Sequence, residues 1–467
     1  MSSLDPGKLT SVDENGDHVR IIPAEVRGFY RKHRTWTQIV LLLVFLILPW
    51  TEMGGRQTVL LNIPDREFSL FGLLFRAHEA PLIFFLLATA ALGLALVTSV
   101  WGRVWCGWAC PQTVFIDAVF RRIEIWTEGT YIKRRQLRDG PMTFEKIRKS
   151  GLKWILFVVV SSVIAHSFMA YFVGARELIQ MMQLPPEQNI NYFLLVVAFT
   201  AVILFDFAWF REQFCVIMCP YGRIQSLLLD QKSLAVVYDV VRGEPRKGLP
   251  TDQGRQGDCV SCNRCVQVCP TGIDIRNGLQ MECIACTACA DACDEIMEKV
   301  KKPRGLIRYD TLDGSKISLT KPRTLIYLTA ICILVGGLSY ALFTRAPVDI
   351  TVLRGQGLPY SYVKDNSGSE WILNQFHLHI QNQSDIPARY QISLPEIDGL
   401  QLNIGENPLD LRGGESHEWY FFVRVRPEVF QKAPGGKLKT KIFVKNLLDE
   451  KGFTAEKDLM LIGPRTP

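Results

Sequence analysis

The chain has 467 residues, of which 48 per cent are hydrophobic and 21 per cent are charged, and its formal net charge is +7. This length is enough for several domains. The basic residues gather in segments that flank long apolar stretches, so the positive charge reflects membrane topology. A nucleic-acid-binding surface is therefore excluded as its cause, and we expect no nucleic-acid partner.

Five stretches without charged residues predict membrane-spanning helices, each of which needs about 20 mostly apolar residues. They are residues 35–51, 80–102, 154–175, 188–205 with an apolar continuation to Phe210, and 324–344. The first is the weakest, because its strongly apolar part runs only from residue 39 to residue 50. A buried core helix is the alternative interpretation of that stretch alone.

Lysine and arginine are distributed unevenly between the connecting segments. Residues 1–34, 103–153 and 211–323 together hold 34 of them, whereas the loops 51–80 and 176–191 hold 4. Because basic loops stay in the cytoplasm, we expect a cytoplasmic N-terminus and a C-terminus on the outer side. Residues 1–34 are polar, so we expect no cleavable signal peptide.

Two matched cysteine pairs emerge on the predicted cytoplasmic face. Cys106 and Cys110 follow the second apolar stretch, Cys215 and Cys219 follow the fourth, and each pair reads aromatic-Cys-x-x-x-Cys-Pro. The repetition predicts an internal duplication with parallel topology. The spacing places both sulfurs on one helical face, and the proline predicts a helix end. Four thiolates there would suit Cu(I), zinc or an iron–sulfur cluster, and the alternative is that they are packed as small hydrophobes.

Four further residues in or near the apolar stretches are candidates for a role. His166 and Asp206 are ionisable groups at membrane depth, where such groups are usually functional. For His166 we weigh a quinone contact, a proton path or copper binding, and we favour a hydrogen bond between helices. Met218 lies within the second cysteine pair, and we expect it to pack in the core rather than to add a thioether ligand. Cys332 has no partner in sequence, so we expect it to be packed as well.

Eight cysteines within 35 residues form two runs of the bacterial ferredoxin spacing. In this spacing the first three cysteines of a run bind one [4Fe–4S] cluster, and the fourth binds the other. The expected ligands of the first cluster are Cys259, Cys262, Cys265 and Cys293, and those of the second are Cys269, Cys283, Cys286 and Cys289. The pattern predicts a protein that moves single electrons.

Zinc and disulfide bonds are the alternative interpretations of these runs. A structural zinc site needs four ligands, and eight at this spacing exceed that number. Disulfides suit an oxidising compartment, whereas the predicted topology places the runs in the cytoplasm. Pro270 follows the first run but Asp294 follows the second, which departs from the usual pattern near Cys293.

Residues 345–467 have an apolar pattern of period two, which is typical of strands. Phe376, Leu378 and Ile380 alternate with His377 and His379. Two further strand candidates are residues 419–424 and 441–444, and turn residues separate the runs. Several short strands in this length predict an immunoglobulin-like sandwich. The two histidines share a face and could bind copper, but a polar strand face is the favoured interpretation.

The chain resembles the cytochrome c oxidase accessory proteins of the CcoG/FixG/RdxA family over nearly its whole length. The resemblance rests on the motif at residues 105–112, the motif at 215–222, the double ferredoxin run and the strand at 374–382. It implies a multi-pass protein of the bacterial inner membrane that assists the assembly of a cbb3-type oxidase. It also implies reduction of Cu(II) to Cu(I) for delivery to the oxidase copper site, and our hypothesis places this step at Cys106, Cys110, Cys215 and Cys219.

We therefore expect a multi-domain membrane protein. Its five-helix α transmembrane region carries an inserted α+β dicluster ferredoxin module and a C-terminal all-β immunoglobulin-like sandwich. The expected parts are a cytoplasmic tail (1–34), a four-span region (35–210) with an amphipathic cytoplasmic loop (103–153), a cytoplasmic segment (211–322) whose ferredoxin module covers about 250–300, a fifth span (323–344) and a periplasmic domain (345–467).

Two other functions stay open at this point. One is a quinone-linked electron relay, as in the membrane ferredoxin proteins of nitrate and nitrous oxide respiration. The other is a non-enzymatic redox sensor that recruits assembly factors. The expected partners are copper ions, oxidase assembly factors or a copper transporter, and an unidentified electron donor. We expect neither a nucleotide cofactor nor covalent haem, since the sequence has no G-x-G-x-x-G after a strand and no C-x-x-C-H.

Overall fold

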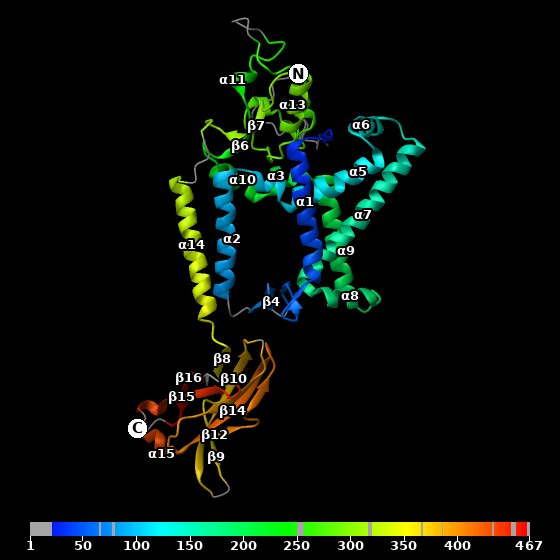
Figure 1. Ribbon diagram of the computed structural model, residues 1–467. Coiled ribbons are helices and arrows are strands. Elements are labelled where there is room, and N and C mark those ends of the chain that lie inside the picture. The colour runs from blue at the N-terminus through cyan, green and yellow to red at the C-terminus, as the bar shows by residue number, and fades with distance from the viewer. Residues whose placement is uncertain are drawn as a thin grey trace. The chain divides into compact units, whose positions relative to one another are not determined.

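The computed structural model describes residues 21–64, 67–76, 80–249, 256–315, 320–365, 368–384, 386–431, 434–449 and 454–464. The chain divides into two compact units, Met1–Tyr340 and Ala341–Pro467. The first unit holds the apolar helices and all eight cysteines of the ferredoxin runs, and the second is a β domain (Figure 1).

Among the described residues, five helices are long and apolar enough to cross a membrane, as predicted. They are α1 (Phe29–Ile47), followed by η1 (Leu48–Trp50), α2 (Ala80–Trp101), α7 (Phe144–Val173), α9 (Ile190–Leu204), continued by the π-helix η4 (Phe205–Phe210), and α14 (Pro322–Phe343). Helix α7 begins before its apolar stretch because the Thr143 side chain accepts a hydrogen bond from the Lys146 N–H and caps the helix. The alternative of a buried core helix for α1 is wrong, since Val40, Val44 and Ile47 are exposed.

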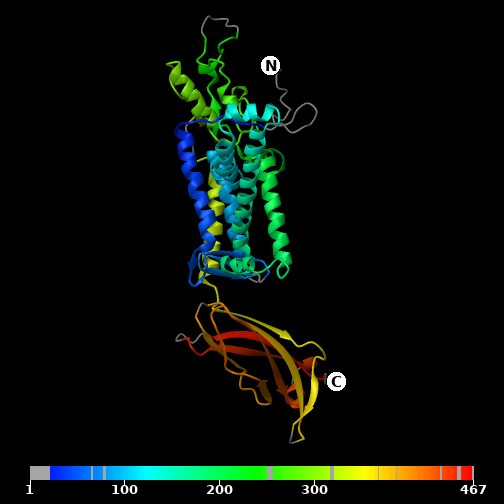
Figure 2. The same cartoon turned by 90° about the vertical axis from the view of Figure 1, so that its right-hand side faces the viewer.

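The connecting elements of the first unit gather at the two ends of these helices (Figures 1 and 2). One end carries β1 (Glu52–Met53), β2 (Arg56–Gln57), β3 (Val59–Asn62), β4 (Glu67–Leu70), β5 (Leu73–Arg76) and α8 (Ala175–Gln183). The other end carries α3 (Val104–Trp108), α4 (Pro111–Phe115), η3 (Ile116–Phe120), α5 (Arg121–Glu128), α6 (Tyr131–Asp139), η5 (Phe214–Met218) and α10 (Pro220–Leu228). Both cysteine pairs therefore lie at the same end.

The ferredoxin module lies beyond that same end (Figure 1). Its elements are β6 (Leu234–Tyr238), α11 (Val240–Gly243), α12 (Arg264–Gln267), η6 (Ile275–Asn277), α13 (Ala288–Lys299) and β7 (Ile307–Thr311). Strands β6 and β7 pair antiparallel and join the two ends of the module. The module is thus closed before the chain enters α14.

The second unit is a sandwich of two antiparallel sheets, in agreement with the predicted immunoglobulin-like fold. Its strands are β8 (Val348–Arg354), β9 (Ser361–Lys364), β10 (Glu370–Asn382), β11 (Ala388–Ser393), β12 (Leu400–Ile404), β13 (Leu409–Leu411), β14 (Ser416–Val425), β15 (Lys437–Asn446) and β16 (Thr454–Ile462), with α15 (Pro427–Gln431) and η7 (Pro434–Gly436). One sheet has the order β12-β14-β10-β8 with β9 beside β10, and the other has β13-β11-β15-β16.

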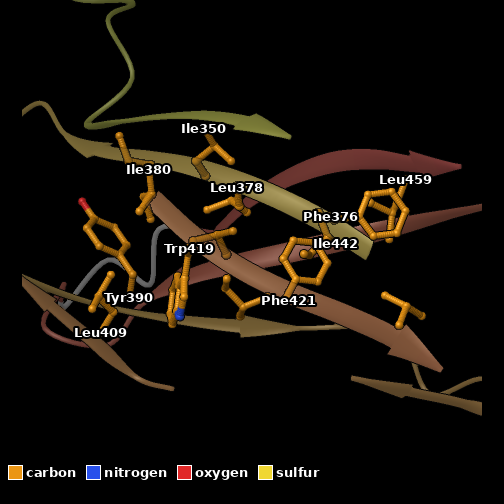
Figure 3. Packing of buried hydrophobic residues seen from close by; sticks show 14 of the residues in the cluster. Ile350, Phe376, Leu378, Ile380, Tyr390, Leu409, Trp419, Phe421, Ile442 and Leu459 are labelled. Atoms are coloured by element: carbon orange, nitrogen blue, oxygen red, sulfur yellow. The ribbon is translucent and has the colours of Figure 1, made fainter. Parts of the chain in front are cut away.

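Alternating side chains of β10 and β14 fill the space between the sheets. Phe376 stacks on Phe421 with ring centroids 5.4 Å apart, and Leu378 and Ile380 are fully buried beside them (Figure 3). Asn374 is also fully buried. Its polar side chain is satisfied there, because it donates one hydrogen bond to the Ile462 carbonyl and accepts one from the Ile462 N–H across the sandwich. The period-two pattern of the sequence is therefore the core pattern of this domain.

Two packing expectations are wrong. Met218 is 62 per cent exposed, and Cys332 on α14 is exposed rather than packed. Ile224 and Leu227 of α10 are exposed too, whereas the corresponding residues after the first cysteine pair, such as Phe115, are buried. The two repeats thus share a backbone pattern but bury different faces.

Candidate metal centres

The eight ferredoxin cysteines are divided between two cavities. One cavity is lined by Cys259, Cys262, Cys265 and Cys293. The other is lined by Cys269, Cys283, Cys286 and Cys289, and Cys265 also borders it. The fold therefore brings together the two sets of four that the spacing predicts, with the fourth cysteine of each run crossing to the other site.

The two cysteine loops have the same unusual backbone. In the first cluster loop (residues 259–265), Ser261 and Asn263 have positive φ angles of 56° and 55°. In the second cluster loop (residues 283–289), Ala285 and Thr287 have φ angles of 53° and 61° at the same two positions. A left-handed conformation costs about 1–2 kcal/mol for a residue with a Cβ, and such strain is typical of functional sites. Successive turns of this kind make a concave nest of N–H groups, which suits an anionic cluster.

The donor chemistry of both cavities fits iron–sulfur clusters. The Ala285 N–H donates to Cys283 Sγ at 3.4 Å, a contact that would stabilise a thiolate ligand. Burial raises the pKa of Cys283 to about 12, and burial together with the charge of Cys265 raises the pKa of Cys293 to about 12. With raised pKa values these thiols are protonated when no metal group is bound. Iron bound to the sulfurs would stabilise the thiolate form, so binding would release protons. No group of three His, Cys, Asp or Glu side chains in the described parts of the chain already has metal-binding geometry.

Each matched cysteine pair lies across a break between two helices rather than on one helix. Cys106 is in α3 and Cys215 is in η5, whereas Cys110 and Cys219 are the N-cap residues of α4 and α10. The proline that follows each N-cap is the first residue of the next helix, a position that proline favours. This location confirms the predicted helix ends.

The duplication is visible in the backbone hydrogen bonds. The Cys110 N–H donates to the Trp105 carbonyl, and the Cys219 N–H donates to the Phe214 carbonyl, both at 2.8 Å. Each bond spans five residues and starts from the aromatic residue of the motif. Two segments that lie far apart in sequence therefore present their cysteines in the same way.

The four sulfurs of these pairs form one electrostatic group, which we call the paired-cysteine site. Burial, followed by the charge of Cys110, raises the pKa of Cys106 to about 12, and Cys219 adds to this while Arg103 opposes it. Burial also raises the pKa of Cys215, with contributions from the other three thiols. A cation bound among these thiols would offset the repulsion between their thiolate forms.

A buried glutamine, which the sequence does not single out, holds one of these thiols. The Cys106 thiol donates to the Gln225 Oε1 at 3.4 Å, and the Gln225 amide donates to the Gly102 carbonyl at 3.4 Å. Gln225 is fully buried. Its spacing from the second proline gives no signal by itself, and only the fold brings it beside the first cysteine pair.

The second cluster loop rests directly on the first cysteine pair. A Cβ atom added at Gly107 would fall 2.6 Å from the Ala285 carbonyl oxygen and 2.7 Å from that of Ile284. Cys106 and Cys215 also pack against the buried group that includes Ile284 and Cys286. The second cluster site is therefore in van der Waals contact with the paired-cysteine site.

Polar contacts fix the loop in this position. Arg103 donates to the Cys283 carbonyl at 2.9 Å, and Arg34 donates to the Cys286 carbonyl at 3.3 Å. Trp108 donates its indole N–H to the Tyr309 hydroxyl at 3.1 Å, and this hydroxyl donates to the Ala285 carbonyl at 2.7 Å. Three carbonyls of the loop thus accept hydrogen bonds that tie the loop to the membrane region.

A network of buried ion pairs lies beside this contact. Asp117 pairs with Arg31, Arg34 and Arg121, all in the first unit. Burial alone would raise the pKa of Asp117, but these arginines hold that pKa well below its usual range. A second buried carboxylate, Glu124, pairs with Arg134 and Arg211. The signal that could have found this network is the presence of charges within the apolar residues 114–125.

The remaining candidates make local contacts. The His166 Nδ1 lies 2.7 Å from the Ser162 carbonyl of its own helix, so the hydrogen bond is within α7 and not between helices. Asp206 accepts from the Gln112 amide at 2.9 Å. In the second unit, the His377 Nε2 lies 3.2 Å from a Glu418 carboxylate oxygen. His379 faces Glu418 in the strand register, so both histidines lie on the polar face of the sheet.

Comparison with known proteins identifies the family. Protein RdxB of Cereibacter sphaeroides is 36 per cent identical over 83 per cent of this chain and 84 per cent of its own length. Protein RdxA of the same organism is 35 per cent identical, over 84 and 86 per cent of the two chains. The nitrogen fixation protein FixG of Rhizobium meliloti is 33 per cent identical, over 82 and 79 per cent. The chain belongs to the FixG/RdxA family.

Three domain models match parts of this family member. A 4Fe-4S dicluster domain matches residues 210–312, and an IG-like fold found at the C-terminus of FixG matches residues 338–464. A 4Fe-4S binding domain also matches residues 82–129, which contain the first cysteine pair. The FixG/RdxA protein is therefore an iron–sulfur redox protein of the membrane, with a β domain at its C-terminal end.

Proposed function

We propose that this FixG/RdxA protein reduces Cu(II) to Cu(I) at the paired-cysteine site and so supplies Cu(I) for assembly of a cbb3-type cytochrome c oxidase. When bound, each [4Fe–4S] cluster stores and passes one electron. One electron is also what a Cu(II) ion needs, so the reaction balances without a proton or a leaving group. The soft thiolates of Cys106, Cys110, Cys215 and Cys219 favour the reduced ion.

The observation that carries the proposal is the contact between the second cluster loop and the first cysteine pair. Gly107 leaves room for the carbonyls of Ile284 and Ala285, so little protein separates the two sites. In the first cluster site, by contrast, Cys262 is exposed. This asymmetry supports entry of electrons at the first cluster site and their exit at the second.

The proposed topology follows the same order. The basic connecting segments favour the cytoplasm for the ferredoxin module and the paired-cysteine site, and the periplasm of the bacterial inner membrane for the C-terminal domain. In this arrangement an unidentified cytoplasmic protein donates the electrons. Oxidase assembly factors or a copper transporter then receive the Cu(I), with the sandwich domain as a docking partner.

Anaerobic reduction of Cu(II) by the purified full chain tests the proposal. With pre-reduced clusters, we expect one Cu(I) for each electron stored, and we expect Cys110→Ser and Cys219→Ser to abolish the reaction while both clusters stay intact. Cys332→Ser is the matched control, because Cys332 is exposed on α14 and has no place in the site. Unchanged copper reduction in both site variants would refute the proposal, and rapid oxidation of a quinol without any effect on copper would support the relay instead.

A further inference from the structure

A cavity of about 610 Å³ lies beside the N-terminal part of α1. Its walls come from the segment before α1, from α1 itself, from η3 and α5, and from residues of the ferredoxin module that include Pro270, Cys286 and Ala288. The cavity therefore lies between the membrane end of a helix and the second cluster site. The cluster cysteines line two other cavities, and of them only Cys286 also borders this one.

The lining of this cavity is strongly basic. Its two carboxylates are Glu25 and Asp117, and its seven basic residues are Arg27, Arg31, Lys32, Arg34, Arg121, Arg122 and Arg134. The excess of positive charge remains even where ion pairs are formed. An anion is the ligand that such a lining favours.

Three other cations of the lining are exposed and free of ion pairs. Arg27, Lys32 and Arg122 line the cavity and are exposed, and none of them forms an ion pair within the described parts of the chain. The buried arginines of the lining, in contrast, are already paired with carboxylates. Three unpaired cations around one opening favour a ligand with several acceptor oxygens, as in a phosphate group.

The other wall of the cavity is apolar and faces outward. Trp36 and Ile39 line it from α1 and are 62 and 39 per cent exposed, respectively. Both lie within a helix that is long and apolar enough to span a membrane. Tryptophan is typical of the level of the lipid headgroups, and basic pockets between helices at this level bind anionic headgroups. A soluble phosphate compound has no acyl chains that could pack against this apolar wall.

We propose that the cavity binds an anionic phospholipid, with its phosphate among Arg27, Lys32 and Arg122 and its acyl chains along Trp36 and Ile39. This inference also concerns the proposed electron transfer through the second cluster. A phosphate beside Cys286 adds negative charge, so the bound lipid would lower the reduction potential of that cluster. The lipid composition of the membrane would then set how readily the protein passes electrons.

Lipid retention by the full chain tests this proposal without any copper reaction. We compare nanodiscs of phosphatidylcholine with nanodiscs that also contain phosphatidylglycerol, and count the lipids that stay bound in native mass spectrometry. The test variant is Lys32→Gln with Arg122→Gln, because both side chains line the cavity and are exposed. The control is Lys133→Gln with Arg148→Gln, which removes two exposed charges away from the cavity.

We expect one retained phosphatidylglycerol in the wild type and the control, and binding about fivefold weaker for each cation removed from the cavity. Equal retention in all three proteins would overturn the proposal. Displacement by millimolar inorganic phosphate would also overturn it, because it would indicate a site for free phosphate. As a second measurement, phosphatidylglycerol should lower the reduction potential of one of the two clusters in the wild type and not in the cavity variant. A potential that does not move would refute the adjustment of the cluster, whatever the outcome of copper reduction.

Discussion

Replacing Gly107 with alanine tests the contact on which the proposed electron transfer depends. The new Cβ would meet the Ala285 carbonyl oxygen at 2.6 Å, whereas ordinary contact begins at 3.4 Å, so one of the two backbones must move by about 0.8 Å. Because the obstacle is backbone and not a flexible side chain, we expect the cost of overpacking, about 1–3 kcal/mol. Alanine gains about 1 kcal/mol over glycine from helix propensity, so the net change is a loss of up to about 2 kcal/mol.

Thermal unfolding and single-turnover copper reduction measure the two consequences. Gly151→Ala is the matched control, because Gly151 lies in α7 and no atom lies within 4 Å of its added Cβ. We expect the control to be stabilised by about 1 kcal/mol and to reduce copper at the wild-type rate. Gly107→Ala should keep both clusters, lose stability and reduce copper more slowly. If it is as stable and as fast as the wild type, the second cluster loop does not rest on the first cysteine pair.

Three further predictions concern the same region. Asp117→Asn should lower the free energy of unfolding by about 3–5 kcal/mol, because it leaves buried arginines without their partner. Folding lowers the pKa of Asp117, so its contribution to the free energy of unfolding is complete above about pH 4 and is lost as the pH falls toward the lowered pKa. In an acid titration followed by circular dichroism, the variant should therefore be less stable than the wild type at neutral pH, and the two proteins should be equally stable at about pH 1. Cys262→Ser and Cys286→Ser should each leave one cluster, and paramagnetic resonance should show one uncoupled signal; two coupled clusters in either variant would contradict the division of the ligands. Asp291 accepts hydrogen bonds from the Tyr30 and Arg31 N–H groups at the start of α1, so Asp291→Ala should cost about 0.5–2 kcal/mol through loss of a helix cap. Asp291→Asn, which keeps an acceptor, should cost less when both variants are compared by denaturant unfolding.

The spacing of the cysteines and the lengths of the apolar stretches predicted most of what is local in this fold. Both depend on short-range geometry, because a run of about 20 apolar residues spans a membrane as a helix and a period of two specifies one face of a strand. The left-handed residues of the cluster loops could not be predicted in the same way. Asn263 is a common residue in that conformation, but Ala285 and Thr287 are not, so the residue types alone do not predict it.

The two wrong packing expectations have one physical cause. Packing of Met218 and Cys332 was expected because apolar residues of a soluble protein gain free energy by leaving water. Next to a membrane, an apolar side chain gains little by moving from lipid into the protein interior, since lipid chains are as apolar as leucine. Such a side chain can therefore remain exposed on the protein surface. For the same reason α1 could not be assigned from its apolar pattern alone, although its exposed Val40 and Val44 now agree with a lipid-facing helix.

What joins the ferredoxin module to the membrane region is a set of contacts between residues far apart in sequence, and each contact uses a group that has little other role. Asp291 of α13 accepts hydrogen bonds from the Tyr30 and Arg31 N–H groups at 3.1 and 2.7 Å, so a carboxylate of the ferredoxin helix caps the first membrane helix. Gly28 is the N-cap residue of that helix, and its missing side chain is required, because an added Cβ would fall 2.3 Å from the Asp291 Cγ. Gly107 leaves the same kind of space for the second cluster loop. A rigid joint of this kind keeps the distance between the cluster sites and the paired cysteines constant, which a one-electron relay between fixed centres needs and which a flexibly tethered ferredoxin domain would not provide.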